Sequence, residues 1–94
     1  ALSTMTLSLA HALAPEVRVN AVCPGFIQGR WTKGFLGDRY QSVKQSVEQQ
    51  TLIGRTSLPE DIAKSIVYLI EDAVTTNGQF LIVDGGELVN QAKL

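Results

Sequence analysis

The amino-acid sequence predicts an α/β fold in which two parallel strands are joined by a long helical crossover. Two short segments, 17–23 and 80–83, are rich in β-branched and other apolar residues, which is typical of buried strands. The long segment between them carries helical patterns, and parallel strands require a crossover of that kind. We therefore expect part of a doubly wound parallel sheet, with helices covering its faces.

The composition indicates one small globular unit. Of the 94 residues, 45% are apolar and 18% are charged, and the formal net charge is −1. Lysine and arginine are scattered singly, so no basic stripe is present for nucleic acid or for an anionic membrane surface. No apolar run reaches the roughly 20 residues of a membrane span. These features predict a cytoplasmic protein without a nucleic-acid or membrane partner.

The single cysteine and the single histidine limit the chemistry of the chain. Cys23 has no partner for an internal disulfide, and Cys23 and His11 together do not make a metal-ligand set. We predict no metal site. His11 is interpreted as a surface or interface histidine on a helix, and Cys23 as a small packing residue rather than a nucleophile.

The first element is a helix over residues 1–14. Its apolar side chains recur at steps of three and four residues, at Leu2, Met5, Leu9 and Leu13. Alanines between them add helix propensity. Pro15 ends the helix, because the residue before a proline is pushed out of the α region.

The strand over 17–23 is expected to stop at Pro24, which has no N–H for a ladder, and Gly25 allows the chain to turn sharply out of the sheet. Arg18 is interpreted as lying near solvent at the beginning of the strand. For the Asn20 amide, hydrogen bonding to neighbouring backbone is favoured over ligand contact. A loop at the carboxyl end of a parallel strand is where ligands bind, so this break is the candidate site.

Glycines and aromatic residues alternate through an irregular segment over 24–37. Trp31 and Phe35 are candidates for a cover that closes over a substrate and excludes water. The alternative is that these side chains simply pack on the sheet or on a neighbouring subunit. A polar helix follows from Asp38, its predicted N-cap, to about Gln50.

The next helix is predicted from a capping box, with Ser57 as N-cap and Glu60 reaching back to it. It extends to about Glu71 and presents a broad apolar face that can cover a sheet. A turn over 75–78 leads to the strand over 80–83, which we expect to be fully buried. The last residues, 87–94, carry no strong pattern.

Three segments of this chain occur in the order and spacing of a known family: 18–27 (Arg-Val-Asn-Ala-Val-Cys-Pro-Gly-Phe-Ile), 58–63 (Leu-Pro-Glu-Asp-Ile-Ala) and 78–86 (Gly-Gln-Phe-Leu-Ile-Val-Asp-Gly-Gly). They resemble the C-terminal part of a short-chain dehydrogenase/reductase. The family's Gly-rich dinucleotide loop, its catalytic Ser and its Tyr-x-x-x-Lys pair are absent, and Ala1 would fall just after that Lys. The resemblance therefore implies that residues 1–94 are the C-terminal fragment of a single Rossmann-like NAD(P)-binding domain, with a lid over about 26–52.

The resemblance also implies an activity, which is hydride transfer between NAD or NADP and a small carbonyl or alcohol substrate. Pro24, Gly25, Phe26 and Ile27 would form the cofactor-binding loop, with the Ile27 backbone meeting the nicotinamide carboxamide. Many family members carry a Thr two residues after this Ile, whereas this chain has Gly29, for which Arg30 and Trp31 are possible replacements. Trp31 and Phe35 would belong to the substrate lid.

The resemblance assigns no catalytic residue to this chain, so the fragment alone is expected to be inactive. The full-length protein is expected to be a homo-oligomer. Two alternatives remain open from the sequence. One is a noncatalytic remnant of the family that serves as an oligomerisation or interaction module. The other is an unrelated α/β protein, such as a small-ligand-binding domain, in which Cys-Pro-Gly is only a turn.

Overall fold

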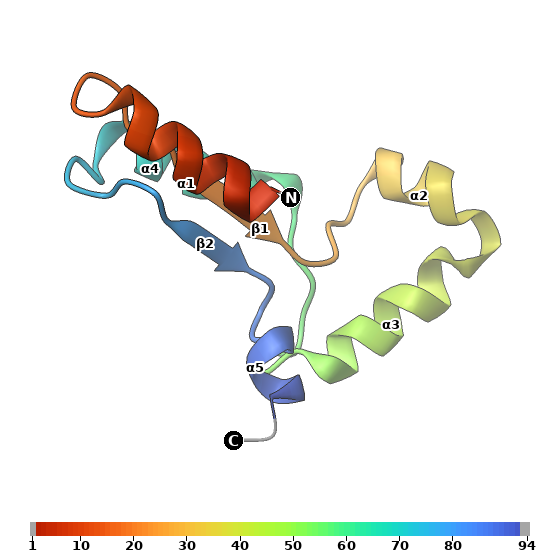
Figure 1. Ribbon diagram of the computed structural model, residues 1–94. Helices are drawn as coiled ribbons and strands as arrows, with labels where there is room; N and C mark the ends of the chain where they lie inside the picture. Colours follow the sequence, from red (N-terminus) through yellow and green to blue (C-terminus); the bar gives the residue numbers. More distant parts are fainter. Residues whose placement is uncertain (1, 93–94) are drawn as a thin grey trace.

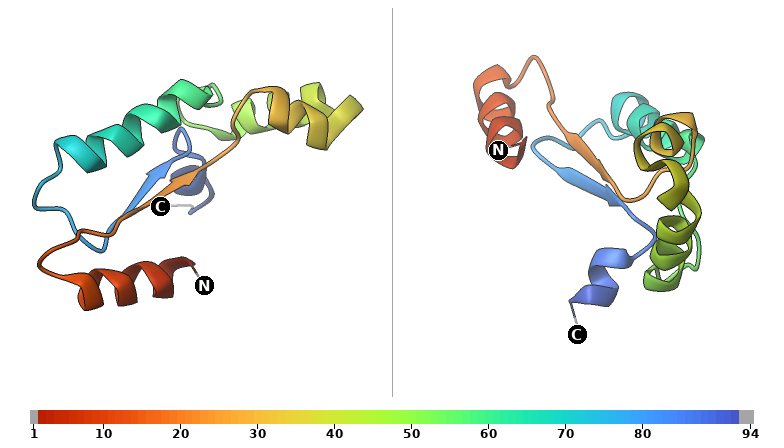
Figure 2. Two further views of the ribbon diagram at one scale, coloured as in Figure 1. Left: turned by 90° about the horizontal axis from the view of Figure 1, so that it is seen from above. Right: turned by 90° about the vertical axis from the view of Figure 1, so that its right-hand side faces the viewer.

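The computed structural model describes residues 2–92 and places a parallel sheet between two helices. Strand β1 (Ala21–Pro24) pairs with strand β2 (Phe80–Val83), with Ala21 opposite Phe80 and Pro24 opposite Val83. Helix α1 (Leu2–Leu13) covers one face of the sheet, and helix α4 (Pro59–Glu71) covers the other (Figures 1 and 2). The predicted α/β class and the parallel pairing are confirmed. The expectations for Ala1 and for residues 93–94 fall outside the described residues.

The crossover from β1 to α4 projects away from the sheet as a helical arm (Figure 2). It contains α2 (Arg30–Leu36), a short 3-10 turn, η1 (Gly37–Arg39), and α3 (Tyr40–Gln50). The prediction of an irregular segment over 24–37 is therefore wrong for α2. The backbone N–H of Lys33 donates to the Gly29 carbonyl at 2.9 Å and begins this helix, so Gly29 marks its start rather than continued coil.

Strand β1 begins later and ends later than predicted. Residues 17–20 lie outside the ladder, while Pro24 lies inside it. Every second residue of a strand directs its N–H group to the same neighbouring strand. Here the Ala21 N–H donates to the carbonyl of Gln79, just before β2, and the Gly25 N–H donates to the carbonyl of Val83 in β2. Pro24 lies between these two donors, so its missing N–H removes no hydrogen bond to β2.

Arg18 contacts the end of α4 instead of solvent, contrary to the interpretation from sequence. Its guanidinium donates hydrogen bonds to four carbonyls at and just beyond the end of the helix, those of Leu69, Ile70, Ala73 and Thr76, over 2.8–3.3 Å. The last carbonyls of a helix have no partner within it. A cation at this end also interacts favourably with the helix dipole. Arg18 thus fixes α4 to the chain that enters β1.

Asn20 joins the beginnings of the two strands through its side-chain amide. Its Nδ2 donates to the Thr76 carbonyl at 3.0 Å, and its Oδ1 accepts from the Gln79 N–H at 3.0 Å. The favoured interpretation of Asn20, hydrogen bonding to neighbouring backbone, is confirmed. The backbone N–H of Gly78, which has φ of 71°, donates to the Val19 carbonyl at 2.8 Å and joins the predicted turn to the chain before β1.

The α4 N-terminus uses a different pair of residues from the one predicted. Leu58 is the N-cap, and its backbone N–H donates to Asp61 Oδ2 at 2.8 Å. Ser57 instead pairs with the segment after β1, since its carbonyl accepts from the Gln28 N–H at 2.8 Å. The capping box of Ser57 and Glu60 is therefore wrong by one residue, because the pairing of Ser57 with that segment fixes where the helix can begin.

We expect Asp61→Ala to lower the free energy of unfolding by about 1 kcal/mol, because it leaves the Leu58 N–H without its carboxylate acceptor. Urea denaturation followed by circular dichroism measures the change. Glu60→Ala is the control, since no hydrogen bond of the Glu60 carboxylate is seen among residues 2–92 and its loss should cost less than half as much. Equal effects of the two substitutions would contradict this account of the cap.

The polar helix α3 ends at Gln50 as predicted, but the Asp38 side chain does not cap it. Asp38 lies in η1, and Arg39 is the N-cap without a side-chain bond. Tyr40, only 6% exposed, holds this end of α3 to the loop after β1. Its ring lies 5.7 Å from that of Phe26 between centroids, and Lys33 Nζ lies 5.4 Å above it. Burial of Tyr40 against these side chains sets the position of the helix.

The prediction that strand 80–83 is fully buried is wrong in this structure. Ile82 is 50% exposed, and the buried apolar residues are mostly alanines, at Ala10, Ala21 and Ala73 together with Tyr40. A sheet of two strands offers too little area to enclose large side chains on both faces. The sequence after the strand, which showed no pattern, forms the short helix α5 (Glu87–Gln91) beside the end of α3.

Candidate functional site

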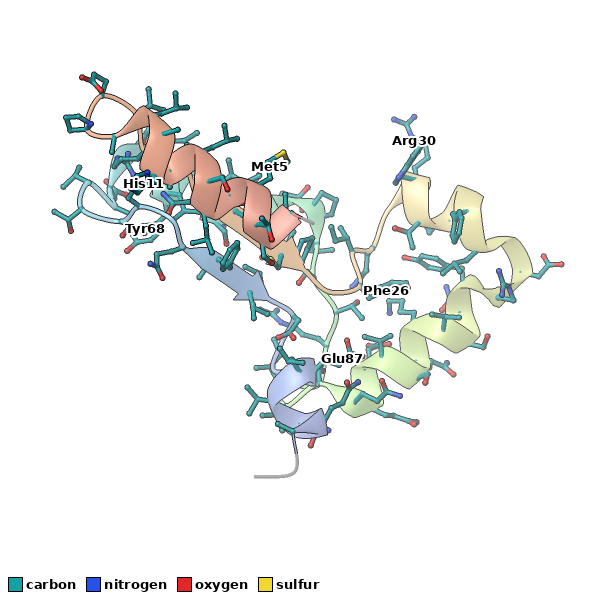
Figure 3. The ribbon with its side chains drawn as sticks, viewed as in Figure 1. Met5, His11, Phe26, Arg30, Tyr68 and Glu87 are labelled. Carbon is teal, nitrogen blue, oxygen red and sulfur yellow. The ribbon has the colours of Figure 1, made fainter. Side chains whose placement is uncertain are left out.

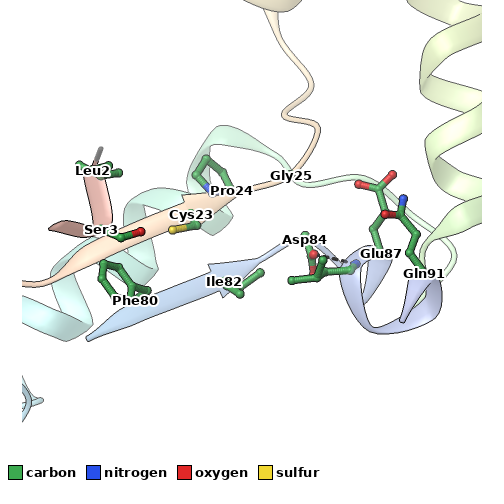
Figure 4. Close-up of a pocket in the computed structure, with 11 residues that line it drawn as sticks. Leu2, Ser3, Cys23, Pro24, Gly25, Phe80, Ile82, Asp84, Glu87 and Gln91 are labelled. Carbon is green, nitrogen blue, oxygen red and sulfur yellow. Dashed lines mark hydrogen bonds between the residues drawn. The ribbon is translucent and has the colours of Figure 1, made fainter. Parts of the chain in front are cut away.

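A cavity of about 450 Å³ lies at the carboxyl ends of the two strands (Figure 4). The sequence predicted a site at this edge of the sheet, and two of the predicted residues, Pro24 and Gly25, line the cavity. The others that line it are Leu2, Ser3, Cys23, Phe80, Ile82, Asp84, Glu87, Leu88 and Gln91. The walls are therefore apolar near the sheet and polar towards α5.

Gly25 passes so close to Asp84 that no side chain fits between them. A Cβ built on Gly25 would lie 2.9 Å from the Asp84 Cβ and 3.1 Å from its Cα. The Gly25 N–H also donates to the Val83 carbonyl at 3.0 Å, which extends the ladder by one residue. Gly25 is not among the glycines with positive φ, so this position requires glycine for close approach rather than for unusual backbone angles.

Asp84 holds the other wall of the cavity and was not singled out from the sequence. Its carboxylate accepts hydrogen bonds from the backbone N–H groups of Gly86 at 2.9 Å and Leu88 at 3.0 Å. A carboxylate at this position satisfies unpaired N–H groups of a short helix and fixes its direction. The signal was present as an Asp directly before two glycines at a strand end, which is typical of a tight turn.

Gly85 joins this turn to the end of the helical arm. Its carbonyl accepts hydrogen bonds from the backbone N–H groups of Leu52 at 2.9 Å and Ile53 at 3.1 Å. A Cβ on Gly85 would lie 3.0 Å from the Ile53 side chain, and its φ is 66°. The arm and the cavity are thus connected at residue 85.

Gly85→Ala is expected to lower the free energy of unfolding by about 2 kcal/mol, because it combines a left-handed backbone with tight contacts. Gly54→Ala is the matched control, since Gly54 has φ of 78° but open space around its Cβ position. It should cost about 1 kcal/mol from the backbone alone. The two free energies of unfolding are measured by urea denaturation, and the difference between them is the cost of the contacts with the arm. Equal values for the two variants would show that these contacts do not constrain residue 85.

Phe26 and Ile27 do not line the cavity, although the sequence grouped them with Pro24 and Gly25. The Phe26 side chain lies towards the arm, where its ring contacts Tyr40 (Figure 3). Ile27 forms an isolated parallel bridge with Ser57. The four predicted cofactor-binding residues therefore divide into two that line the cavity and two that connect the sheet to the arm.

The predicted lid residues Trp31 and Phe35 lie on α2, with exposed fractions of 91% and 82%. They border a separate hollow of about 570 Å³, together with Arg30 and Gly34. The structure does not bring them to the cavity at the strand ends. Their spacing of four residues places both on one face of α2.

Neither a metal cluster nor a membrane-spanning helix is found over residues 2–92. In this range no group of three or more His, Cys, Asp or Glu side chains could hold a metal ion. The helices within it are too short or too polar to cross a bilayer. The candidate site consists of the cavity, the close approach of Gly25 to Asp84 at its wall, and the helical arm beside it.

Comparison with known proteins gives consistent matches along the chain. The sequence model of the family described as enoyl-(acyl carrier protein) reductase matches residues 1–87. A Streptomyces violaceoruber protein, named as a ketoacyl reductase of the granaticin polyketide synthase, is 43% identical over 81 residues, which are 86% of this chain and 31% of that protein. The short-chain dehydrogenase/reductase homolog YusR of Bacillus subtilis is 41% identical over 83 residues, 88% of this chain and 60% of that protein.

Solved structures give the same result for the fold. A small-chain dehydrogenase in complex with NADPH superimposes with a TM-score of 0.85 and 31% identity, over 95% of this chain and 40% of that chain. The present chain thus spans between about a third and 60% of the length of the relatives it matches. The matches cover the sheet, the cavity and the arm, and the chain belongs to the short-chain dehydrogenase/reductase family.

Proposed function

We propose that this chain is the C-terminal portion of an NAD(P)-dependent oxidoreductase and supplies its nicotinamide-side loop and its substrate lid. The observation that carries the proposal is the cavity at the carboxyl ends of two parallel strands, where ligands bind in open α/β sheets. Pro24 and Gly25 line this cavity, and the close approach of Gly25 to Asp84 brings the ends of the two strands together at its wall.

The proposed reaction is hydride transfer between the nicotinamide of NAD or NADP and a small carbonyl or alcohol substrate. The cofactor supplies the hydride chemistry, while the protein binds and orients. In this chain the loop of Pro24, Gly25, Phe26 and Ile27 would lie beside the nicotinamide ring. The name of one relative, a ketoacyl reductase, supports a carbonyl compound as substrate.

We place the proton-transfer groups outside this chain. Among residues 2–92, neither a Tyr nor a Lys lines the cavity, whereas the family uses a Tyr and Lys pair for proton transfer. Residues 1–94 alone should therefore not turn over substrate. The role of the arm would be to close over the substrate through Trp31 and Phe35, because exclusion of water assists hydride transfer. We further propose that the protein is cytoplasmic.

The test is titration of NADPH and NADH into the longest natural protein that contains this chain, followed by tryptophan fluorescence. Saturable quenching is expected, and Trp31→Phe should remove the part of the signal that arises from the lid. Carbonyl-dependent oxidation of the reduced cofactor should be seen with the long protein and not with residues 1–94. A long protein that neither binds nor oxidises either cofactor would refute the oxidoreductase assignment.

A second candidate function, an oligomerisation or interaction module, is favoured by one observation on α4. Three large side chains on this helix have much of their surface exposed to solvent: Val67 (47%), Tyr68 (50%) and Ile70 (66%). Exposed apolar side chains grouped on one element are typical of an interaction surface. A second copy of the family protein would cover them in a homo-oligomer. Analytical ultracentrifugation of the long protein and of its Ile70→Glu variant tests this, with dissociation expected in the variant and a monomeric wild type contradicting it.

A further inference from the structure

Helix α5 forms the polar wall of the cavity at the strand ends (Figure 4). Glu87 and Gln91 of this helix line the cavity, and their spacing of four residues places both on one face of α5. Pro24 and Gly25 line it from the end of β1. A cofactor ring beside Pro24 and Gly25 would therefore share the cavity with a second molecule, for which α5 supplies polar contacts.

The two carboxylates that line the cavity differ in what they already bind. Asp84 accepts one hydrogen bond on each oxygen, from the backbone N–H groups of Gly86 at 2.9 Å and Leu88 at 3.0 Å. Glu87 is half-buried, and its carboxylate has no hydrogen bond or ion pair with any other group in residues 2–92. Glu87 is therefore the charged acceptor that this wall offers to a ligand.

Helix α5 is held at both ends, so Glu87 has a set place beside the sheet. Asp84 fixes the beginning of the helix through the Leu88 N–H. Near the other end, Asn90 Nδ2 donates to the carbonyl of Gln50, the last residue of α3, at 2.8 Å. A side chain on a supported element can discriminate between ligands better than one on a free loop.

The charge of Glu87 favours some groups on a ligand and disfavours others. A carboxylate accepts hydrogen bonds and donates none, so it binds a hydroxyl group well. A carboxylate on the ligand would instead be repelled. Within residues 2–92, lysine, arginine and histidine are absent from the cavity lining, so this wall carries no positive charge to offset the repulsion.

We propose that Glu87 selects the substrate, by accepting a hydrogen bond from a hydroxyl group of an uncharged carbonyl compound and by disfavouring compounds that carry a carboxylate. The apolar side chains of Phe80 and Ile82, which line the same cavity, would contact the carbon chain of the substrate. The inference rests on the proposed function, which puts the nicotinamide beside Pro24 and Gly25. It narrows the substrate class from carbonyl compounds to neutral, hydroxylated ones.

The test measures reduction of three ketones by NADPH or NADH in the longest natural protein that contains this chain. The ketones have the same number of carbons: butan-2-one, 4-hydroxybutan-2-one and acetoacetate. Wild type should show the highest kcat/KM with 4-hydroxybutan-2-one. Glu87→Leu should lower the ratio of its kcat/KM to that of butan-2-one about tenfold, because a hydrogen bond to a charged group is lost.

Glu87→Gln separates the hydrogen bond from the charge. Its amide oxygen still accepts, so most of the preference for the hydroxylated ketone should remain. Because the negative charge is gone, kcat/KM for acetoacetate relative to butan-2-one should rise about fivefold. Glu71→Gln is the matched control, since Glu71 is exposed at the end of α4 and does not line the cavity. It should leave both ratios as in wild type.

A Glu87→Leu protein that keeps the wild-type ratio would overturn the assignment, even if its activity with both ketones falls, because Glu87 would then serve only the fold. A wild type that binds cofactor but does not prefer the hydroxylated ketone, or reduces none of the three, would also overturn it. A long protein that binds neither NADPH nor NADH would refute the proposed function itself, and the role of Glu87 with it.

Discussion

Gly25→Ala is expected to lower the free energy of unfolding by about 3 kcal/mol and to abolish detectable NADPH binding by the natural protein that contains this chain. The new Cβ would meet the Asp84 Cβ at 2.9 Å and the Asp84 Cα at 3.1 Å. Backbone cannot move aside as a flexible side chain can, so the two strand ends must separate. Separation would weaken the bond from Gly25 N–H to the Val83 carbonyl and change the shape of the cavity. Urea denaturation and cofactor titration measure the two effects.

Gly34→Ala is the control for this substitution, because it adds the same methyl group at a position with nothing within 4 Å of the new Cβ. Gly34 lies inside α2, where alanine is favoured over glycine by roughly 0.5 to 1 kcal/mol. Gly34→Ala should therefore leave stability unchanged or raise it, with NADPH binding retained. A Gly25→Ala protein as stable as wild type would show that the approach of Asp84 is not a constraint.

Arg18→Met is expected to lower the free energy of unfolding by roughly 2 to 4 kcal/mol, because hydrogen bonds from a charged group are lost together. Three of the four hydrogen bonds that Arg18 donates are partly buried. Methionine keeps the apolar length of the side chain but leaves those carbonyls without the guanidinium. Urea denaturation of the natural protein, with circular dichroism as the signal, gives the value.

Arg18→Lys should recover less than half of the loss, since a single ammonium group cannot reach carbonyls arranged around a planar guanidinium. Arg39→Met is the control for removal of an arginine, because Arg39 is exposed on η1 and no side-chain bond of it is seen in residues 2–92. Its effect should stay within about 0.5 kcal/mol. An Arg18→Met effect as small as that of Arg39→Met would refute the role of Arg18 at the end of α4.

Most elements of the fold could be predicted from short-range patterns. The helix ending before Pro15, the end of α3 at Gln50 and the strand over 80–83 all follow from apolar spacing and turn residues within a few positions. The boundaries that failed depend on distant partners. Strand β1 begins at Ala21 because only there does the chain meet β2, and α4 begins after Leu58 because Ser57 pairs with the segment following β1.

A cavity lies at the edge of the sheet where the sequence predicted a site, but its lining differs from the predicted set of residues. Pro24 and Gly25 line the cavity as the break in the strand indicated. Asp84, which forms the facing wall, lies far away in the sequence, and nothing local connects it with Gly25. The exposure of Trp31 likewise depends on where α2 projects, which amphipathic spacing does not specify.

Local residue types therefore determined the α/β class, the order of the elements and the edge of the sheet at which the cavity lies, because these depend on periodicity and on the geometry of proline and glycine. The packing of distant segments decided the rest. Close approach at Asp84 requires glycine at position 25, and four carbonyls at the end of α4 give Arg18 its place. Glu87 lines the cavity because Asp84 and Asn90 hold α5 in place beside the strand ends.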